Sequence, residues 1–237
     1  MTRSLAYTNF LLRYREVTRL LAAAHRYEYA AIKRSRTDLQ ETANALSRSV
    51  VMLLAGHLEG YLGDLISEIC DAMPSKWDTA IVPKKIFVAQ AVIDDLLKAL
   101  HFTDGAAPQN AKQLDALKSD VEMISAYFSK PNAVKPRRLE GYYRNDGPGA
   151  VEKLMLSLNP AGPKFFDWME QLGTDRSRMW VTLQTVTRDR NQIAHGSLTT
   201  TKTPQDARTA VCVVVAMVRR VERYCSQHGL LSQQGLT

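Results

Sequence analysis

The sequence predicts an all-α fold, a long antiparallel bundle of helices, and three observations support this. Hydrophobic residues recur at intervals of three and four over most of the 237-residue chain. Proline and glycine interrupt these runs at only a few places, where helices are expected to end. No segment that resembles a strand has an evident partner strand. A chain of this length buries a core without disulfide bonds or metals, and we expect one domain over residues 1–237.

The first two helices are predicted to be long and to pack against each other. Apolar residues at helical spacing predict one helix from about Ser4 to Arg34. Thr37, followed three residues later by Gln40, matches a capping box, which predicts Thr37 as the N-cap of a second helix that runs to Pro74. Because the connection is short, the two helices are expected to be antiparallel neighbours.

The middle of the chain is predicted to form a helical insertion over about residues 74–175. A proline favours the start of a helix over 84–100, and a further helix is expected over 111–128. Residues 131–148, rich in proline, glycine and basic side chains, are the best candidate for a linker. A short helix over 149–158 is expected to follow.

Two more helices are expected at the end of the chain, over residues 177–194 and 204–227. The run Val211–Val215 in the second of them is rich in β-branched residues, so a strand is the alternative there. Since no partner strand is evident, we predict a helix.

The stretch before the last helix concentrates the residues best suited to chemistry. It reads Arg188-Asp189-Arg190-Asn191-Gln192-Ile193-Ala194-His195-Gly196. Arginine is a permanent planar cation that binds phosphate, and histidine can take and give a proton near neutral pH. This combination suits phosphodiester chemistry, with Arg190, Asn191 and His195 as candidate catalytic residues and Arg188 as a second phosphate contact.

Helical geometry decides which of these side chains can meet. At about 100° per residue, Asn191 and His195 share a face, and Arg188 and His195 differ by only about 20°. Arg190 and His195 diverge by about 140° on a straight helix. Either the helix loosens before Gly196, a plausible residue to end it, or Arg190 serves a site completed by another element.

Structural alternatives stand beside each functional role. Arg188 is equally well explained by an ion pair with Asp189 or Asp175. Asn191 can be a capping group, and His195 can satisfy carbonyls at a helix end.

The motif resembles the signature of a known superfamily. Residues 190–195 fit an R-x4-H pattern, and R-N-x-x-A-H-G is similar to the signature of the HEPN superfamily, of the RiboL-PSP-HEPN type. Residues 54–62, Leu-Ala-Gly-His-Leu-Glu-Gly-Tyr-Leu, resemble the glutamate-bearing second helix of bacterial members. The resemblance covers the segments around 40–70 and 178–225. It implies a HEPN-like helical core with extra inserted helices.

The resemblance also implies a function. Many HEPN proteins are metal-independent endoribonucleases that act as homodimers, with the motifs of both copies lining a cleft. We therefore expect an RNA-cleaving enzyme, a toxin or phage-defence effector restrained by an antitoxin or another regulatory protein. Glu59 is expected to reach the motif, with a solvated glutamate as the alternative. The second hypothesis is a non-catalytic HEPN-like module that binds RNA, nucleotide or a partner protein.

The expected chemistry needs no cofactor. RNA carries its own nucleophile, the 2′-hydroxyl, so cleavage requires a base and a cation that stabilises the phosphorane. His195 would be the base, Arg190 the cation, and Asn191 would orient His195 or bind the phosphate. One such histidine per chain leaves the acid unassigned, and a two-fold dimer would supply a second His195.

The net charge of +7 favours an anionic partner, with nucleic acid as the first candidate. Basic residues outnumber acidic ones in the first 50 residues. A second basic cluster, adjacent to two tyrosines, is a candidate for RNA binding, with a solvated loop as the equal alternative. Its members are Lys135, Arg137, Arg138 and Arg144.

Other classes of protein are not favoured. Scattered histidines and the absence of a C-x-x-C pair predict no metal site. Cys70, Cys212 and Cys225 are expected to be buried free thiols. No apolar run approaches a membrane span, and the N-terminus lacks a signal sequence, so we expect a cytoplasmic protein without membrane contact.

Overall fold

The fold is described by a computed structural model for residues 3–71, 118, 122, 147–159, 162–196 and 201–231. These residues form six α-helices and no strand, which confirms the all-α prediction. The helices are α1 (Leu5–Arg34), α2 (Thr37–Asp71), α6 (Pro148–Leu158), α7 (Phe165–Gln171), α8 (Arg176–Ala194) and α9 (Pro204–Gln227).

Several sequence predictions fall outside this description. The expected helix over 84–100 and nearly all of that over 111–128 lie outside the described residues, as does the basic stretch 131–146. The run Val211–Val215 is helical and lies within α9, so the strand alternative is wrong. Its side chains at helical spacing line the core, where β-branched residues pack well despite their lower helix propensity.

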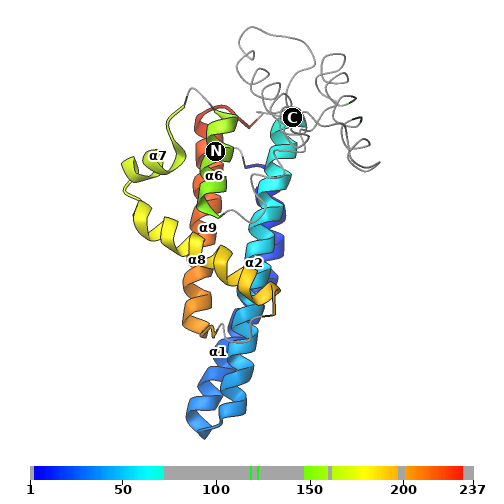
Figure 1. Ribbon diagram of the computed structural model, residues 1–237, viewed down its shortest axis with the longest axis vertical. Helices are drawn as coiled ribbons and strands as arrows, with labels where there is room; N and C mark the ends of the chain where they lie inside the picture. Colours follow the sequence, from blue (N-terminus) through cyan, green and yellow to red (C-terminus); the bar gives the residue numbers. More distant parts are fainter. Residues whose placement is uncertain are drawn as a thin grey trace, which may run out of the picture.

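Helices α1 and α2 form a long antiparallel hairpin whose tip projects beyond the other helices (Figure 1). Ser4 is the N-cap of α1, and its side chain accepts a hydrogen bond of 2.9 Å from the Tyr7 amide. The helix ends at Ser35, a non-glycine residue in the left-handed region with a φ of 47°. Lys33 and Arg34 in the last turn complement the helix dipole.

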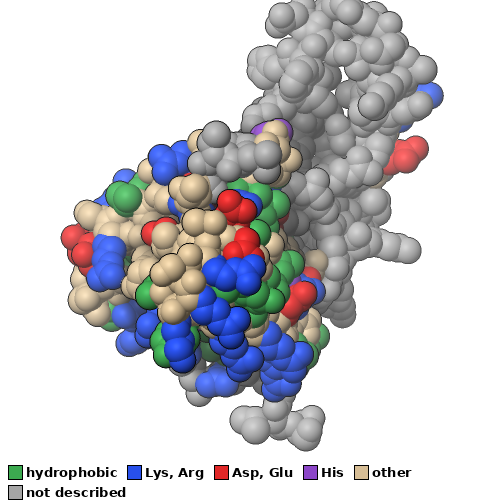
Figure 2. Space-filling view, turned by 90° about the horizontal axis from the view of Figure 1, so that it is seen from below, with side chains coloured by type: hydrophobic (Ala, Val, Ile, Leu, Met, Phe, Trp, Pro, Cys, Tyr) green, Lys and Arg blue, Asp and Glu red, His purple; other side chains and the backbone are tan. Residues whose placement is uncertain are grey.

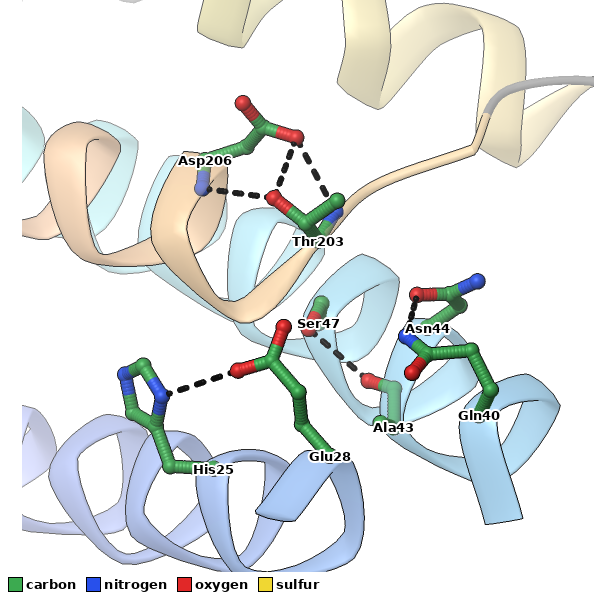
Figure 3. Close-up of polar contacts among 8 residues, drawn as sticks. All are labelled: His25, Glu28, Gln40, Ala43, Asn44, Ser47, Thr203 and Asp206. Atoms are coloured by element: carbon green, nitrogen blue, oxygen red, sulfur yellow. Dashed lines mark hydrogen bonds and ion pairs between the residues drawn. The ribbon is translucent and has the colours of Figure 1, made fainter. Parts of the chain in front are cut away.

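The start of α2 corrects the predicted capping box. The Gln40 amide donates to the Arg36 carbonyl over 3.4 Å, so Arg36 occupies the N-cap position and Thr37 is already helical. The Gln40 side chain donates instead to Asn44 over 3.2 Å (Figure 3). The prediction was wrong by one residue because the left-handed Ser35 reverses the chain at once, and the helix resumes two residues later.

Helix α9 packs against α1, α2 and α8, and α8 crosses α2 (Figure 1). Thr203 and Asp206 form a capping box at the start of α9: the Asp206 amide donates to the Thr203 hydroxyl, and the Thr203 amide donates to the Asp206 carboxylate (Figure 3). Pro204 follows at the first helical position, where its missing amide proton costs nothing.

Part of the expected insertion contributes to the same core. Helices α6 and α7 place Leu154, Phe165 and Phe166 in the hydrophobic cluster formed by α1, α2, α8 and α9. Tyr224 of α9 packs edge-on against Phe165 and Trp168, with ring centroids 5.5 and 5.2 Å away. Its hydroxyl donates to the Pro163 carbonyl over 2.9 Å.

A buried carboxylate connects three helices. Glu222 of α9 accepts hydrogen bonds from the Ser4 amide at 3.1 Å, from the Ser4 hydroxyl, and from the Tyr61 hydroxyl at 2.9 Å. Burial, and then the carboxylate of Glu222, raises the pKa of Tyr61 well above its usual value, so the phenol remains a donor. The start of α1, the carboxyl-terminal half of α2 and the last turns of α9 are thereby joined.

Helix α2 differs from the expectation that no stretch resembles a membrane span. Residues Thr37–Ile69 contain an 18-residue window that is apolar enough to cross a membrane by length and composition alone, and 44% of this window is buried inside the protein. One helix that passes this test is weak evidence for a membrane span. The apolar residues are spread among small polar ones rather than forming one run, which is why inspection of the sequence missed them.

The cysteines only partly match their expected environment. Cys225 is buried, as predicted, and forms no disulfide bond with another described residue. Cys212 forms no disulfide bond but is exposed, because it lies on the outer side of α9. Its neighbours Val211 and Val214 lie on the buried side of the same helix.

Replacement of Glu222 by alanine is expected to destabilise the protein by at least about 2 kcal/mol, because the buried Ser4 amide and Tyr61 hydroxyl lose their acceptor. Urea unfolding of Glu222→Ala would measure this loss. Glu170→Ala, which removes an exposed carboxylate, serves as the control and should unfold like the wild type. Equal stability of the two variants would contradict the role assigned to Glu222.

His57 is expected to make stability depend on pH. Burial lowers its pKa, while the Glu16 carboxylate 3.9 Å away acts in the opposite direction. Below the usual histidine pKa of about 6.5, the unfolded chain therefore binds more protons at this site than the folded chain. The free energy of unfolding decreases as the pH is lowered, until the pH reaches the folded-state pKa of His57. Urea unfolding at pH 7.5 and 5.5 should show a smaller loss of stability in His57→Gln than in the wild type, and an equal loss in the two proteins would contradict this role of His57.

Candidate active site

The R-x4-H motif lies at the carboxyl end of α8, where that helix crosses α2. Asp175 caps the start of α8 by accepting from the Arg178 amide over 2.9 Å. At the other end, the His195 amide still donates to the Asn191 carbonyl over 3.0 Å. Gly196 then adopts a φ of 80°, which ends the helix just past His195 as the sequence predicted.

Arg190 reaches α2 and forms an ion pair with Glu59 through its terminal guanidinium nitrogen. The contact joins residues 131 positions apart in the sequence. Both side chains are largely but not fully buried, 18% exposed for Arg190 and 31% for Glu59. A guanidinium has five donors, so an ion pair with one carboxylate leaves others free to bind a second anion.

His195 lies apart from this pair. It is exposed and caps α8 with near-helical backbone angles, φ −86° and ψ 13°. The helix does not loosen, so Arg190 and His195 diverge by about 140°. No hydrogen bond or ion pair joins their side chains in the described part of the chain. Asn191, half-buried, lies one turn before His195 on the same face.

Arg188 is exposed, with its Nε 3.9 Å from the Asp189 carboxylate. The alternative of an ion pair with Asp189 is thus present in the structure, at the outer limit of such contacts. Its side chain is 66% exposed and remains accessible to an anion.

Sequence analysis missed the partner of Asp189. This carboxylate is only 6% exposed and forms an ion pair of 2.5 Å with the Lys202 ammonium group, which lies just before α9. A signal existed: Asp189 follows Leu183 and Val186 on the buried stripe of α8, and a carboxylate in that position needs a cation. The pair ties the start of α9 to the motif helix.

A pocket of about 460 Å³, open solvent included, lies where α2, α6 and α8 meet. Its apolar wall is formed by Ala55, Leu58, Leu62, Ala150, Val151, Leu183 and Val186. Glu59, Arg190 and Thr187 supply the polar groups. Gly147, with a φ of 64°, lies so close that an added Cβ would stand 3.1 Å from the Thr187 hydroxyl, so a side chain there is disfavoured by both backbone and space. The Arg190 guanidinium therefore lies at the edge of an accessible recess.

Two other sequence expectations concern metals and RNA contacts. Among the described residues, no group of three histidine, cysteine, aspartate or glutamate side chains is placed to hold a metal ion. The candidate RNA-binding residues Lys135, Arg137, Arg138 and Arg144 lie outside the described residues.

Comparison with known proteins identifies the family. Residues 25–227 match the family model described as RiboL-PSP-HEPN. No curated protein and no solved structure matches the chain. The matched region includes the glutamate-bearing α2, the motif helix α8 and all of α9, and it extends across the middle segment that the sequence motifs left unassigned. The chain therefore belongs to the RiboL-PSP-HEPN family within the HEPN superfamily.

Proposed function

We propose that the protein is a metal-independent endoribonuclease. Membership of the HEPN superfamily suggests an RNase-like or nucleotide-related function. The observation that carries the finer proposal is the end of α8, where an arginine held by Glu59 and an accessible histidine lie five residues apart. Simple RNA binding does not require this pair, because any exposed cations supply affinity for phosphate.

The proposed reaction is an attack of the RNA 2′-hydroxyl on the adjacent phosphate. His195 removes the 2′-hydroxyl proton, the 2′ oxygen bonds to phosphorus, and the bond from phosphorus to the 5′ oxygen breaks. Arg190 neutralises the charge that develops on the non-bridging oxygens, and Asn191 orients His195 or binds the phosphate. The products are a 2′,3′-cyclic phosphate and a 5′-hydroxyl, and the departing 5′ oxygen must receive a proton.

A second copy of the chain would complete this site. Within one chain Arg190 faces α2 while His195 lies at the exposed helix end, so one chain offers a single histidine to serve as both base and acid. A two-fold dimer places a second His195 opposite the first, and one would act as base and the other as acid. Exposed Arg188 is available to such a shared cleft.

Glu59 acts on the reaction through Arg190. Its carboxylate holds the guanidinium at the edge of the pocket and leaves donors free for phosphate. In the cell, a toxin or phage-defence role with a regulatory protein as partner fits an enzyme that would otherwise degrade RNA without restraint.

The second candidate function is a non-catalytic HEPN module that binds RNA, nucleotide or a protein. The observation that favours it is the pairing of Arg190 with Glu59 inside one chain, which also serves as a structural link between α2 and α8. Loss of His195 distinguishes the two functions. It should abolish cleavage by an enzyme but leave a binding module unaffected, and it should leave the fold intact in both cases because an exposed histidine contributes little to folding.

Replacement of His195 by alanine is expected to reduce RNA cleavage by about 10²- to 10⁴-fold, the usual contribution of general acid–base catalysis. Cleavage by the wild type should persist in EDTA and fail on DNA of the same sequence, which lacks the 2′-hydroxyl. Gel analysis of labelled oligonucleotides and mass spectrometry of the product ends would measure both. His25→Ala is the matched control and should cleave normally. Intact RNA with folded wild-type protein would favour the binding module.

Replacement of Glu59 by alanine is expected to slow cleavage at least tenfold while RNA affinity changes little, because Arg190 remains charged but loses its fixed position. Single-turnover kinetics would separate the rate of cleavage from binding. Glu41→Ala removes an exposed carboxylate from the same helix and should leave the rate unchanged. An unaltered rate in Glu59→Ala would show that the ion pair is purely structural.

A further inference from the structure

The outer face of α1 carries cations that the proposed active site does not use. Arg15, Arg19, Arg26 and Lys33 are all exposed. At about 100° per residue they fall, together with the exposed residues Leu12, Ala22 and Tyr29, within an arc of about 100°. We call this surface the α1 stripe. It lies opposite the buried side of the helix, on which Val17, Ala24 and Ala31 face the core.

The α1 stripe contains no acidic residue. The two acidic residues of α1, Glu16 and Glu28, lie outside the arc. Among the described residues, no carboxylate forms an ion pair with any of the four cations of the stripe. Arg13 on the same helix contrasts with them, because it lies 3.3 Å from Asp64 of α2. The four charges of the stripe are therefore available to an external anion.

Length and composition of the stripe fit a polyanion. From Arg15 to Lys33 the helix rises about 27 Å, at 1.5 Å per residue. Tyr29 is 68% exposed and stands one turn from both Arg26 and Lys33. A tyrosine between cations is the combination that holds single-stranded nucleic acid, with a base stacked on the ring and phosphates on the cations. Figure 2, which looks onto the end of the molecule with the hairpin tip, shows Lys and Arg side chains gathered along one edge with hydrophobic side chains beside them.

We propose that the α1 stripe binds the backbone of single-stranded RNA. It would bind a part of the substrate that lies outside the proposed active site. The identity of the ligand rests on the proposed function. A membrane surface fits less well, because a membrane-bound amphipathic helix needs a broad free apolar face, and the apolar face of α1 is buried against α2 and α9. Leu12 and Tyr29 are the only exposed large apolar residues within the arc.

The test measures binding rather than cleavage. Each variant is made in the His195→Ala background, so that a fluorescent single-stranded RNA stays intact. The Kd for this RNA is measured by fluorescence anisotropy between 50 and 300 mM salt. This range of about sixfold is wide enough to determine how Kd depends on salt. Arg19→Gln with Arg26→Gln is expected to weaken binding at least tenfold at low salt. The slope of log Kd against log salt should fall by about 1.4, since each lost phosphate contact on a single strand accounts for about 0.7.

The matched control is Arg208→Gln with Arg219→Gln, which removes two exposed cations from α9 and leaves the same net charge. It should bind RNA like the parent. Tyr29→Ala should weaken binding about fivefold or more, while Tyr29→Phe, which keeps the ring, should not. Thermal unfolding of each variant would verify that the fold is intact.

Three outcomes would overturn the proposal: equal loss of affinity in the stripe and control pairs, unchanged affinity in the stripe pair, or a stripe that governs binding to phosphatidylserine vesicles but not to RNA. A parallel cleavage assay with intact His195 keeps the two proposals apart. Stripe-dependent binding without cleavage would refute only the nuclease, and cleavage without stripe-dependent binding would refute only the α1 stripe.

Discussion

The packing of α2 against three other helices is the constraint on which the rest of the structure depends. Helix α1 covers it along the hairpin, and α8 and α9 pack against it from elsewhere in the sequence. The apolar residues of α2 are buried by its contacts with these three helices together. Two carboxylates then fix the arrangement, because Glu222 joins α9 to Tyr61 of α2, and Glu59 of α2 joins Arg190 of α8.

The same arrangement also holds the short motif of α8 in place. Arg190 is held by a residue of α2, and Asp189 beside it is held by Lys202 at the start of α9. The helix end that carries His195 is therefore tied on two sides, while His195 itself is exposed. A rigid support for an accessible histidine is consistent with the proton transfer that we propose for His195. The divergence of Arg190 and His195 on a regular helix is the physical reason to expect a second copy at the site.

Charge on this protein is used in two different ways. Arg190, Lys202, Arg13 and Arg176 are paired with carboxylates and contribute to the fold. The cations of the α1 stripe have no such partner in the described part of the chain and contribute to the positive potential of one surface. Unpaired cations attract anions over a distance of about 8 to 10 Å at physiological salt, so they would act on an RNA substrate before it reaches the proposed catalytic residues.

The sequence by itself determined α1, α8 and α9 and the position of the motif. Periodicity placed α1, α8 and α9 within one or two residues of their observed ends, and Gly196 marked the end of α8, because these features depend on neighbours along the chain. Only the tertiary structure decided that Arg190 pairs with Glu59, that Asp189 is buried against Lys202, and that Cys212 is exposed. These depend on how helices distant in sequence cross, and a 3.6-residue period carries no information about the partner that faces a given side chain.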